Sequence, residues 1–225
     1  MNNKKFYLLI YILCLTPLSW ADDVQQKEKN CYRNISEDCN IAGVWHAENK
    51  DYAKAKYFFE KVCNEKEIIG CNNIGVLYDK GQGVNQDYAQ AKHFFEMGCN
   101  AQDAFACYNL GNLYDKGNGV LQDYKKANTL YEKGCNGGDM WGCTALGWNY
   151  QQGKGVQKNY VKAKQFYEKG CNGGDPFSCA NLAYLYLKGY GTPQDIVKAQ
   201  EFYNQACTMG NKEACQSVIK LFPFY

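Results

Sequence analysis

Apolar residues recur along most of the chain at the three- and four-residue steps that place side chains on one face of a helix. One kind of segment combines an apolar residue, a small residue and a tyrosine, as in Ile74, Gly75, Leu77 and Tyr78. Its later copies are Leu110, Gly111, Leu113 and Tyr114, then Leu146, Gly147, Asn149 and Tyr150, then Leu182, Ala183, Leu185 and Tyr186. The second kind of segment is Tyr88, Ala91, Phe94 and Phe95, then Tyr124, Ala127, Leu130 and Tyr131, then Tyr160, Ala163, Phe166 and Tyr167. The pattern predicts two kinds of amphipathic helix that alternate along the chain.

A short glycine turn separates the two kinds of helix in each copy. The turns are Gly81 to Val84, Gly117 to Val120, Gly153 to Val156 and Gly189 to Thr192. Their first glycine suits the left-handed residue that ends a helix. The small column Gly75, Gly111, Gly147 and Ala183 predicts a close approach of two helices, because a larger side chain would hold the backbones apart. Each copy is therefore expected to be a helix, a turn and an antiparallel helix.

Cysteines set the length of the repeat. Cys63, Cys99, Cys135, Cys171 and Cys207 are spaced by 36 residues, and Cys71, Cys107, Cys143, Cys179 and Cys215 follow them in step. A constant period of this size is typical of a solenoid. The first copy, Cys39 to Cys63, lacks the glycine turn, and Ala214 to Leu221 is expected to form a last helix. We predict an all-α solenoid of five α/α helix pairs and a C-terminal capping helix within residues 22–225.

The N-terminus has the features of a signal peptide over residues 1–21. Lys4 and Lys5 precede an apolar stretch, from Phe6 to Leu18, that is too short for a transmembrane helix, and Ser19 and Ala21 suit cleavage after Ala21. An uncleaved anchor is the alternative, although no charge cluster follows the apolar stretch. We predict a secreted or periplasmic protein with no membrane span after cleavage.

Charge argues against nucleic acid as a partner. Loss of Lys4 and Lys5 with the leader leaves 23 basic and 23 acidic residues, and Arg33 is the single arginine. Proteins that follow a phosphate backbone concentrate Lys and Arg on one face, and no such patch occurs here.

The twelve cysteines that remain after cleavage form six pairs with seven residues between partners: Cys31/Cys39, Cys63/Cys71, Cys99/Cys107, Cys135/Cys143, Cys171/Cys179 and Cys207/Cys215. A turn such as Asn172 to Asp175 reverses the chain between two helices and can bring the partners within disulfide range. Export supplies the oxidising compartment that preserves such bonds. Structural zinc is the rival interpretation, but its ligands are usually spaced by two to four residues and no C-x-x-C occurs. We predict six disulfides and no metal.

The string C-N-x-x-D-x-x-x-C-x-x-L-G-x-x-Y-x-x-G-x-G-V, followed by D-Y-x-x-A-x-x-x-Y-E-x-G-C, resembles the Sel1-like repeat over about residues 31 to 219. Its paired cysteines resemble those of the Helicobacter cysteine-rich protein family. The resemblance implies a right-handed superhelix of tetratricopeptide-related helix pairs. It also implies either an adaptor that meets other proteins or a penicillin-binding protein with weak β-lactamase activity.

Catalytic motifs are sparse. A serine β-lactamase needs Ser-x-x-Lys, Ser-Asp-Asn and Lys-Thr-Gly elements, and only Ser217 to Lys220 matches the first. Of the two histidines, His46 stands in the tyrosine column that includes Tyr78 and is expected to pack there, whereas His93 is expected to lie on a solvated face. The glycine turns lack the third glycine or the Lys-Ser/Thr of phosphate-binding loops, so we expect connectors and no cofactor.

Stacked helix pairs offer a concave groove lined by the first helix of each pair. By resemblance to tetratricopeptide repeats, two positions in each first helix are expected to face it. One column is Asn72, Tyr108, Thr144 and Ala180, and the other is Val76, Asn112, Trp148 and Tyr184. The aromatic members Tyr108, Trp148 and Tyr184 either form binding hot spots or pack against neighbouring repeats. We predict a scaffold that binds a protein or peptide partner. The alternative is a protein that binds a β-lactam or cell-wall peptide and slowly hydrolyses penicillin-type substrates.

Overall fold

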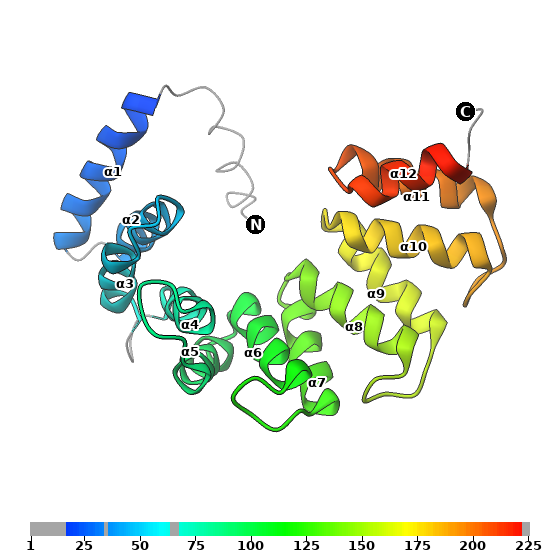
Figure 1. Cartoon of the computed structure of the whole chain (residues 1–225), viewed down its shortest axis with the longest axis horizontal. Helices are drawn as coiled ribbons and strands as arrows, with labels where there is room; N and C mark the ends of the chain where they lie inside the picture. The colour runs from blue at the N-terminus through cyan, green and yellow to red at the C-terminus, as the bar shows by residue number, and fades with distance from the viewer. Residues whose placement is uncertain (1–16, 34–35, 64–67, 222–225) are drawn as a thin grey trace, which may run out of the picture. The chain divides into compact units, whose positions relative to one another are not determined.

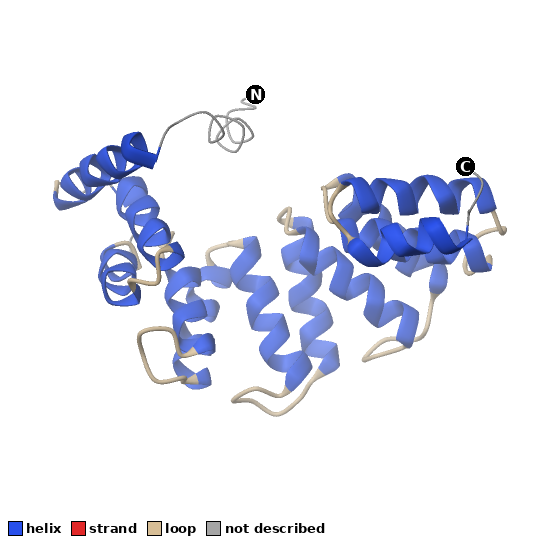
Figure 2. Ribbon diagram, turned by 45° about the horizontal axis from the view of Figure 1, so that its top comes forward, coloured by secondary structure: helices blue, strands red, loops and turns tan. Residues whose placement is uncertain are grey.

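The computed structural model describes residues 17–33, 36–63 and 68–221, and every regular element in those ranges is an α-helix (Figures 1 and 2). This confirms the predicted all-α fold. The helices are α1 (Pro17–Tyr32), α2 (Ser36–Glu48), α3 (Tyr52–Lys61), α4 (Cys71–Lys80), α5 (Tyr88–Asn100), α6 (Ala104–Lys116), α7 (Tyr124–Asn136), α8 (Met140–Gln152), α9 (Tyr160–Asn172), α10 (Pro176–Lys188), α11 (Ile196–Thr208) and α12 (Lys212–Leu221). The chain divides into two compact units, residues 1–86 and 87–225.

In the first unit, α1 precedes the helix pairs and packs against α2. The repeat pattern did not define α1. Val24 of α1 is buried, and the ammonium group of Lys27 lies 2.8 Å from Oδ1 of Asp38 on α2. Nε2 of His46 lies 2.6 Å from Oε1 of Glu28, and the imidazole stacks on Phe58. His46 is therefore a packed residue of the helix interface, as its column predicts.

In the second unit, α5 to α12 pack in chain order, and α6 with α7, α8 with α9 and α10 with α11 form the three complete pairs. Gly117 ends α6 in the left-handed conformation, with φ of 73°. Gly119 also has positive φ, and a Cβ there would lie 2.4 Å from Cβ of Tyr88. The second glycine of the turn therefore contacts the start of α5, the second helix of the preceding pair. The positive φ favours glycine at both Gly117 and Gly119.

The small column accommodates an aromatic ring from the partner helix. A Cβ added to Gly111 would lie 2.7 Å from the ring of Tyr131, and one added to Gly147 would lie 2.8 Å from the ring of Tyr167. Both rings are buried. The prediction that this column permits close approach is confirmed, and the atoms that occupy the space belong to a tyrosine ring as well as to backbone.

Aspartate side chains begin the first helices of the second unit. Asp103, Asp139 and Asp175 precede α6, α8 and α10, and each accepts a hydrogen bond from one or two backbone N–H groups of the first turn. Such caps satisfy donors that have no partner within the helix. Because all three residues follow the cysteine-containing turn, the turn sets both the start of the helix and the position of a carboxylate.

The six predicted disulfides are present, with Cα–Cα distances between 4.5 and 4.7 Å. They join Cys31 to Cys39, Cys63 to Cys71, Cys99 to Cys107, Cys135 to Cys143, Cys171 to Cys179 and Cys207 to Cys215. Each bridge fixes the reversal between one repeat and the next.

The predicted signal peptide lies mostly outside the described residues. Its positions 17–21 belong to α1, which continues past the predicted cleavage point to Tyr32. Within the described part of the chain, no helix has the length and apolar character needed to cross a bilayer.

Candidate binding pocket

Three successive first helices of the second unit form an aromatic pocket of about 460 Å³. Tyr108 comes from α6, Phe177 and Asn181 come from α10, and Asp175 caps α10. The remaining residues, all from α8, are Trp141, Thr144, Ala145 and Trp148. The first helices lie side by side in the stack and repeat every 36 residues. The pocket between them is therefore lined by side chains from several positions of the repeat.

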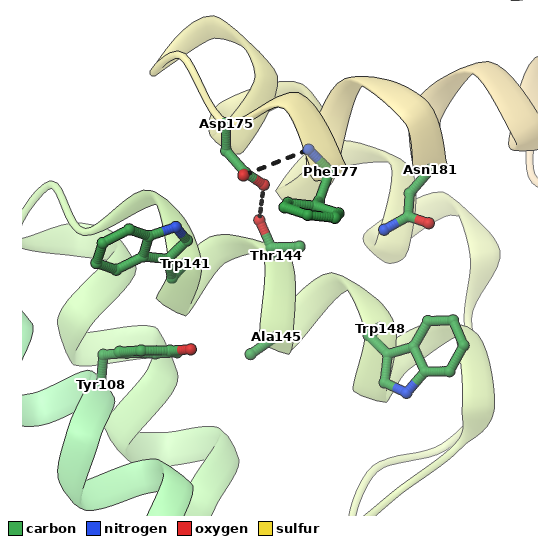
Figure 3. A pocket seen from close by; sticks show the side chains of 8 residues that line it. All are labelled: Tyr108, Trp141, Thr144, Ala145, Trp148, Asp175, Phe177 and Asn181. Atoms are coloured by element: carbon green, nitrogen blue, oxygen red, sulfur yellow. Dashed lines mark hydrogen bonds between the residues drawn. The ribbon is translucent and has the colours of Figure 1, made fainter. Parts of the chain in front are cut away.

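Figure 3 shows Trp141 and Tyr108 on one side of the pocket and Trp148 with Asn181 on the other. The ring centroids of Tyr108 and Trp141 lie 6.0 Å apart, so the two rings form a continuous aromatic wall. Trp141 is 54% exposed, Trp148 44% and Phe177 59%. The pocket therefore offers large apolar surfaces to an incoming ligand.

Asp175 supplies the charged group of the pocket. It is 2% exposed, and Oδ2 accepts hydrogen bonds from the Thr144 hydroxyl at 2.6 Å and from the Ser178 amide at 2.8 Å. Oδ1 accepts from the Phe177 amide at 3.3 Å. The donors are all neutral, so they hold the carboxylate in place without cancelling its charge.

The preceding junction is built differently. Asp139 is fully buried, and Oδ1 accepts from the Gly142 amide. Its Oδ2 has no hydrogen-bond partner among the described residues. The positions of Thr144 and Ser178 are occupied one repeat earlier by Tyr108 and Gly142, which provide no such hydroxyl contact. Burial, and next the charge of Asp103, raise the pKa of Asp139 to about 6.

The predicted groove residues have different environments. Tyr108, Thr144 and Trp148 come together in the pocket. Asn112 is half-buried and accepts a hydrogen bond from the Tyr131 hydroxyl at 2.8 Å, which ties it to its own helix pair.

Four more predicted groove residues lie outside the pocket, as Asn112 does. Tyr184 is 36% exposed and its ring contacts Tyr190, whereas Ala180 is half-buried on α10. Asn72 and Val76 are half-buried on α4 of the first unit. The column prediction therefore located part of the pocket and extended beyond it.

The pocket contains five residues that the groove prediction missed: Trp141, Ala145, Asp175, Phe177 and Asn181. A sequence signal existed for two of them, because Phe105, Trp141 and Phe177 are spaced by 36 residues. An exposed aromatic thus recurs at the second residue of each of these first helices. Asp175 lies at the capping position, where a structural role is sufficient to explain an aspartate.

Ser217, the one Ser-x-x-Lys serine of the chain, does not lie in the pocket. It is on α12, and its hydroxyl donates to the Glu213 carbonyl at 2.9 Å. Lys220 is exposed on the same helix. Within residues 17–33, 36–63 and 68–221, no group of three or more His, Cys, Asp or Glu side chains could hold a metal ion.

Comparison with protein families identifies the same repeat that the sequence pattern predicts. The model described as Sel1 repeat matches residues 44–65, 68–103, 104–139, 142–175 and 176–211, which together make up most of the chain. Its boundaries follow the 36-residue period, and the match at 44–65 corresponds to the shortened first pair.

Individual relatives share the repeat and cover different lengths. HcpC of Helicobacter pylori, whose name gives beta-lactamase as a provisional activity, is 52% identical over 42 residues, which are 19% of this chain and 14% of HcpC. The chain thus matches a small part of that relative.

Solved structures match over more of the chain. A Sel1 repeat protein from Oxalobacter formigenes is 27% identical with a TM-score of 0.77, covering 84% of this chain and 79% of that protein. The protective antigen c5321 of uropathogenic Escherichia coli is 25% identical with a TM-score of 0.74, covering 86% of this chain and 43% of that antigen.

Proposed function

The chain belongs to the Sel1 repeat family, and we propose that it is an exported scaffold that binds a protein partner through the first helices of its repeats. The observation that carries the proposal is the pocket in which Tyr108, Trp141, Trp148 and Phe177 gather on three helices. Tryptophan and tyrosine are the residues that most often dominate binding energy at protein interfaces. Large exposed aromatics that recur on one helix face support a role in recognition.

Export is supported by the chemistry of the cysteines. All twelve cysteines of the repeats are paired in disulfides, which persist in the periplasm and outside the cell but are rare in the cytosol. The predicted leader over residues 1–21 provides the route. We therefore place the scaffold in an oxidising compartment, secreted or periplasmic.

Hydrolysis is not proposed. A serine nucleophile requires a base within hydrogen-bonding reach of its hydroxyl, and the Ser217 hydroxyl instead donates to a carbonyl of its own helix. The described residues thus give no specific support to the β-lactamase alternative that the resemblance to the Helicobacter proteins raised.

Affinity capture with a double variant tests the proposal. Trp148→Ala with Tyr184→Ala removes two exposed rings from the same column of the first helices. Leu121→Ala with Val197→Ala is the matched control, because both side chains are exposed and apolar but lie on the α6–α7 turn and on α11. We expect the first variant to lose a crosslinked partner from the native compartment and the control to keep it. Equal capture by both variants would reject this face as the binding surface.

A further inference from the structure

We propose that the pocket receives an arginine side chain of the partner, with its guanidinium group against the aromatic walls and near the Asp175 carboxylate. This inference rests on the proposed function and specifies the chemistry that its partner presents. Three independent features of the described residues support it: the aromatic faces, the absence of a cation from this chain on them, and the sign of the nearby charges.

The aromatic faces are suited to a planar cation. Trp141 and Trp148 lie on either side of Thr144 and Ala145 on α8, and in the view of Figure 3 the Phe177 ring projects from α10 between them. A guanidinium group is attracted to the negative face of an aromatic ring, most strongly to tryptophan. Arginine is also less strongly hydrated than lysine and stacks its plane on such rings, so it loses less solvation on entering.

The chain pairs lysines with another column of tyrosines. Lys126 lies 4.1 Å from the ring centroid of Tyr114, Lys162 lies 5.1 Å from that of Tyr150, and both Lys164 and Lys198 approach that of Tyr186. These tyrosines are spaced by 36 residues and belong to the first helices. Cations of the same chain therefore cover this aromatic column throughout the second unit.

No lysine of the described residues covers the pocket aromatics in this way, although Tyr108, Trp141, Trp148 and Phe177 lie on the same helices. Helix α8, which contributes half of the lining residues, has no charged residue. The pocket rings, unlike the tyrosine column, are therefore available to a cation from another molecule.

The charges beside the pocket are negative. Asp175 is the charged residue of the pocket lining. In the described part of the chain, it forms no ion pair with a lysine or arginine. Burial raises the pKa of the Tyr108 hydroxyl, a hydrogen bond with Asn112 opposes the rise, and the carboxylates of Asp139 and Asp175 add to it. A buried carboxylate is screened little by salt, so its field extends to a group held on the aromatic wall.

Charge also selects among possible occupants. An acidic side chain would be repelled by Asp175, and a purely apolar side chain would leave its charge without a counterion. An arginine fills the aromatic space and compensates the charge, and its N–H groups match the acceptor oxygens of Thr144 and Asn181 at the pocket lining.

The test is an NMR titration of the oxidised full-length protein with N-acetyl-arginine amide, followed through the indole N–H signals. N-acetyl-citrulline amide, a neutral molecule of nearly the same shape, is the comparison at equal ionic strength. We expect a dissociation constant that is roughly millimolar for the arginine compound and about tenfold weaker for citrulline. The shifts should affect Trp141 and Trp148 and leave Trp45, an indole of the first unit, unchanged.

Two variants separate the ring from the charge. Trp148→Leu should weaken arginine binding about fivefold through loss of a cation–π contact. Asp175→Asn should weaken it roughly fivefold through loss of the charge while keeping the helix cap, because Asn211 caps α12 at the same position of the repeat. Asp195→Asn, which makes the same chemical change at the cap of α11, is the control and should bind as the parent does.

The outcomes distinguish this inference from the function on which it rests. Equal binding of arginine and citrulline, or absence of shifts at Trp141 and Trp148, would overturn the arginine pocket. If partner capture still depended on Trp148 and Tyr184, the scaffold function would stand while the inference failed. Selective arginine binding without any captured partner would support the pocket chemistry and remove the proposed function.

Discussion

The buried carboxylate of Asp139 gives the fold a defined response to pH. Its Oδ2 lacks a hydrogen-bond partner in the described structure, and burial together with the charges of Asp103 and Asp175 raises its pKa to about 6 from an ordinary value of 3.8. The carboxylate binds a proton more tightly in the folded chain than in the unfolded chain. Asp139 therefore contributes stability that is fully present below about pH 3.8 and is lost as the pH rises through about 6.

The magnitude follows from the difference between the two pKa values. Each pKa unit corresponds to about 1.4 kcal/mol, so a rise from 3.8 to about 6 corresponds to about 3 kcal/mol over the complete titration. Between about pH 7.5 and about pH 4.5 the folded state should gain roughly 2 kcal/mol from this one group. Asn at this position does not titrate, so Asp139→Asn should abolish the gain.

The assay is urea denaturation of the oxidised protein at both pH values, followed by tryptophan fluorescence, for the parent and for Asp139→Asn. Subtracting the variant's pH dependence from that of the parent removes the contribution of all other carboxylates. A titration of the Asp139 side-chain carbon by NMR gives the pKa of the folded state directly. It should have its midpoint near pH 6.

Asp175→Asn is the matched control. Asp175 stands at the same position one repeat later, but its carboxylate accepts hydrogen bonds from Thr144 and from the Ser178 amide. This variant keeps the buried Asp139 carboxyl and removes only the smallest of the causes that raise its pKa, so it should keep most of the pH response that Asp139→Asn abolishes. An Asp139 carboxyl that titrates near pH 4, or an Asp139→Asn variant with the parent's pH dependence, would refute the reasoning.

Two further predictions concern the repeat itself. Replacing Cys135 and Cys143 together by alanine should lower the free energy of unfolding by about 2.5 kcal/mol through the closed loop that the bridge imposes on the unfolded chain, as measured by urea denaturation; an unchanged midpoint would contradict this. Gly147→Ala should destabilise by about 1 to 2 kcal/mol in thermal unfolding, because crowding against the Tyr167 ring outweighs the better helix propensity of alanine, and a higher melting temperature would contradict it.

Much of the fold follows from the repeat in the sequence. The steps of three and four residues define the helix faces, and the glycines at positions such as Gly117 have the left-handed conformation that ends a helix. The cysteine pairs are close in sequence and separated by a reversing turn, so local geometry alone brings partners such as Cys99 and Cys107 together. These features are local, and periodic repetition makes each one visible several times.

Helix α1 could not be defined in the same way. It lies outside the period, and its contacts with α2 depend on particular partners such as Lys27 with Asp38 and Glu28 with His46. No repeated pattern marks those residues. A turn between two helices at the Cys31/Cys39 pair implies a helix before it, but the sequence provided no measure of how far that helix extends toward the N-terminus.

The sequence by itself determined the helix pairs, their turns, the disulfide partners and the two columns to which Tyr108, Thr144 and Trp148 belong. Only the tertiary structure decided that Trp141, Phe177 and Asp175 join them in one pocket, while Asn112 is held by Tyr131 within its own repeat. The physical reason is that periodicity specifies which face of a helix a residue occupies. The packing of three successive helices then decides which of those faces meet, and which side chains a neighbour covers.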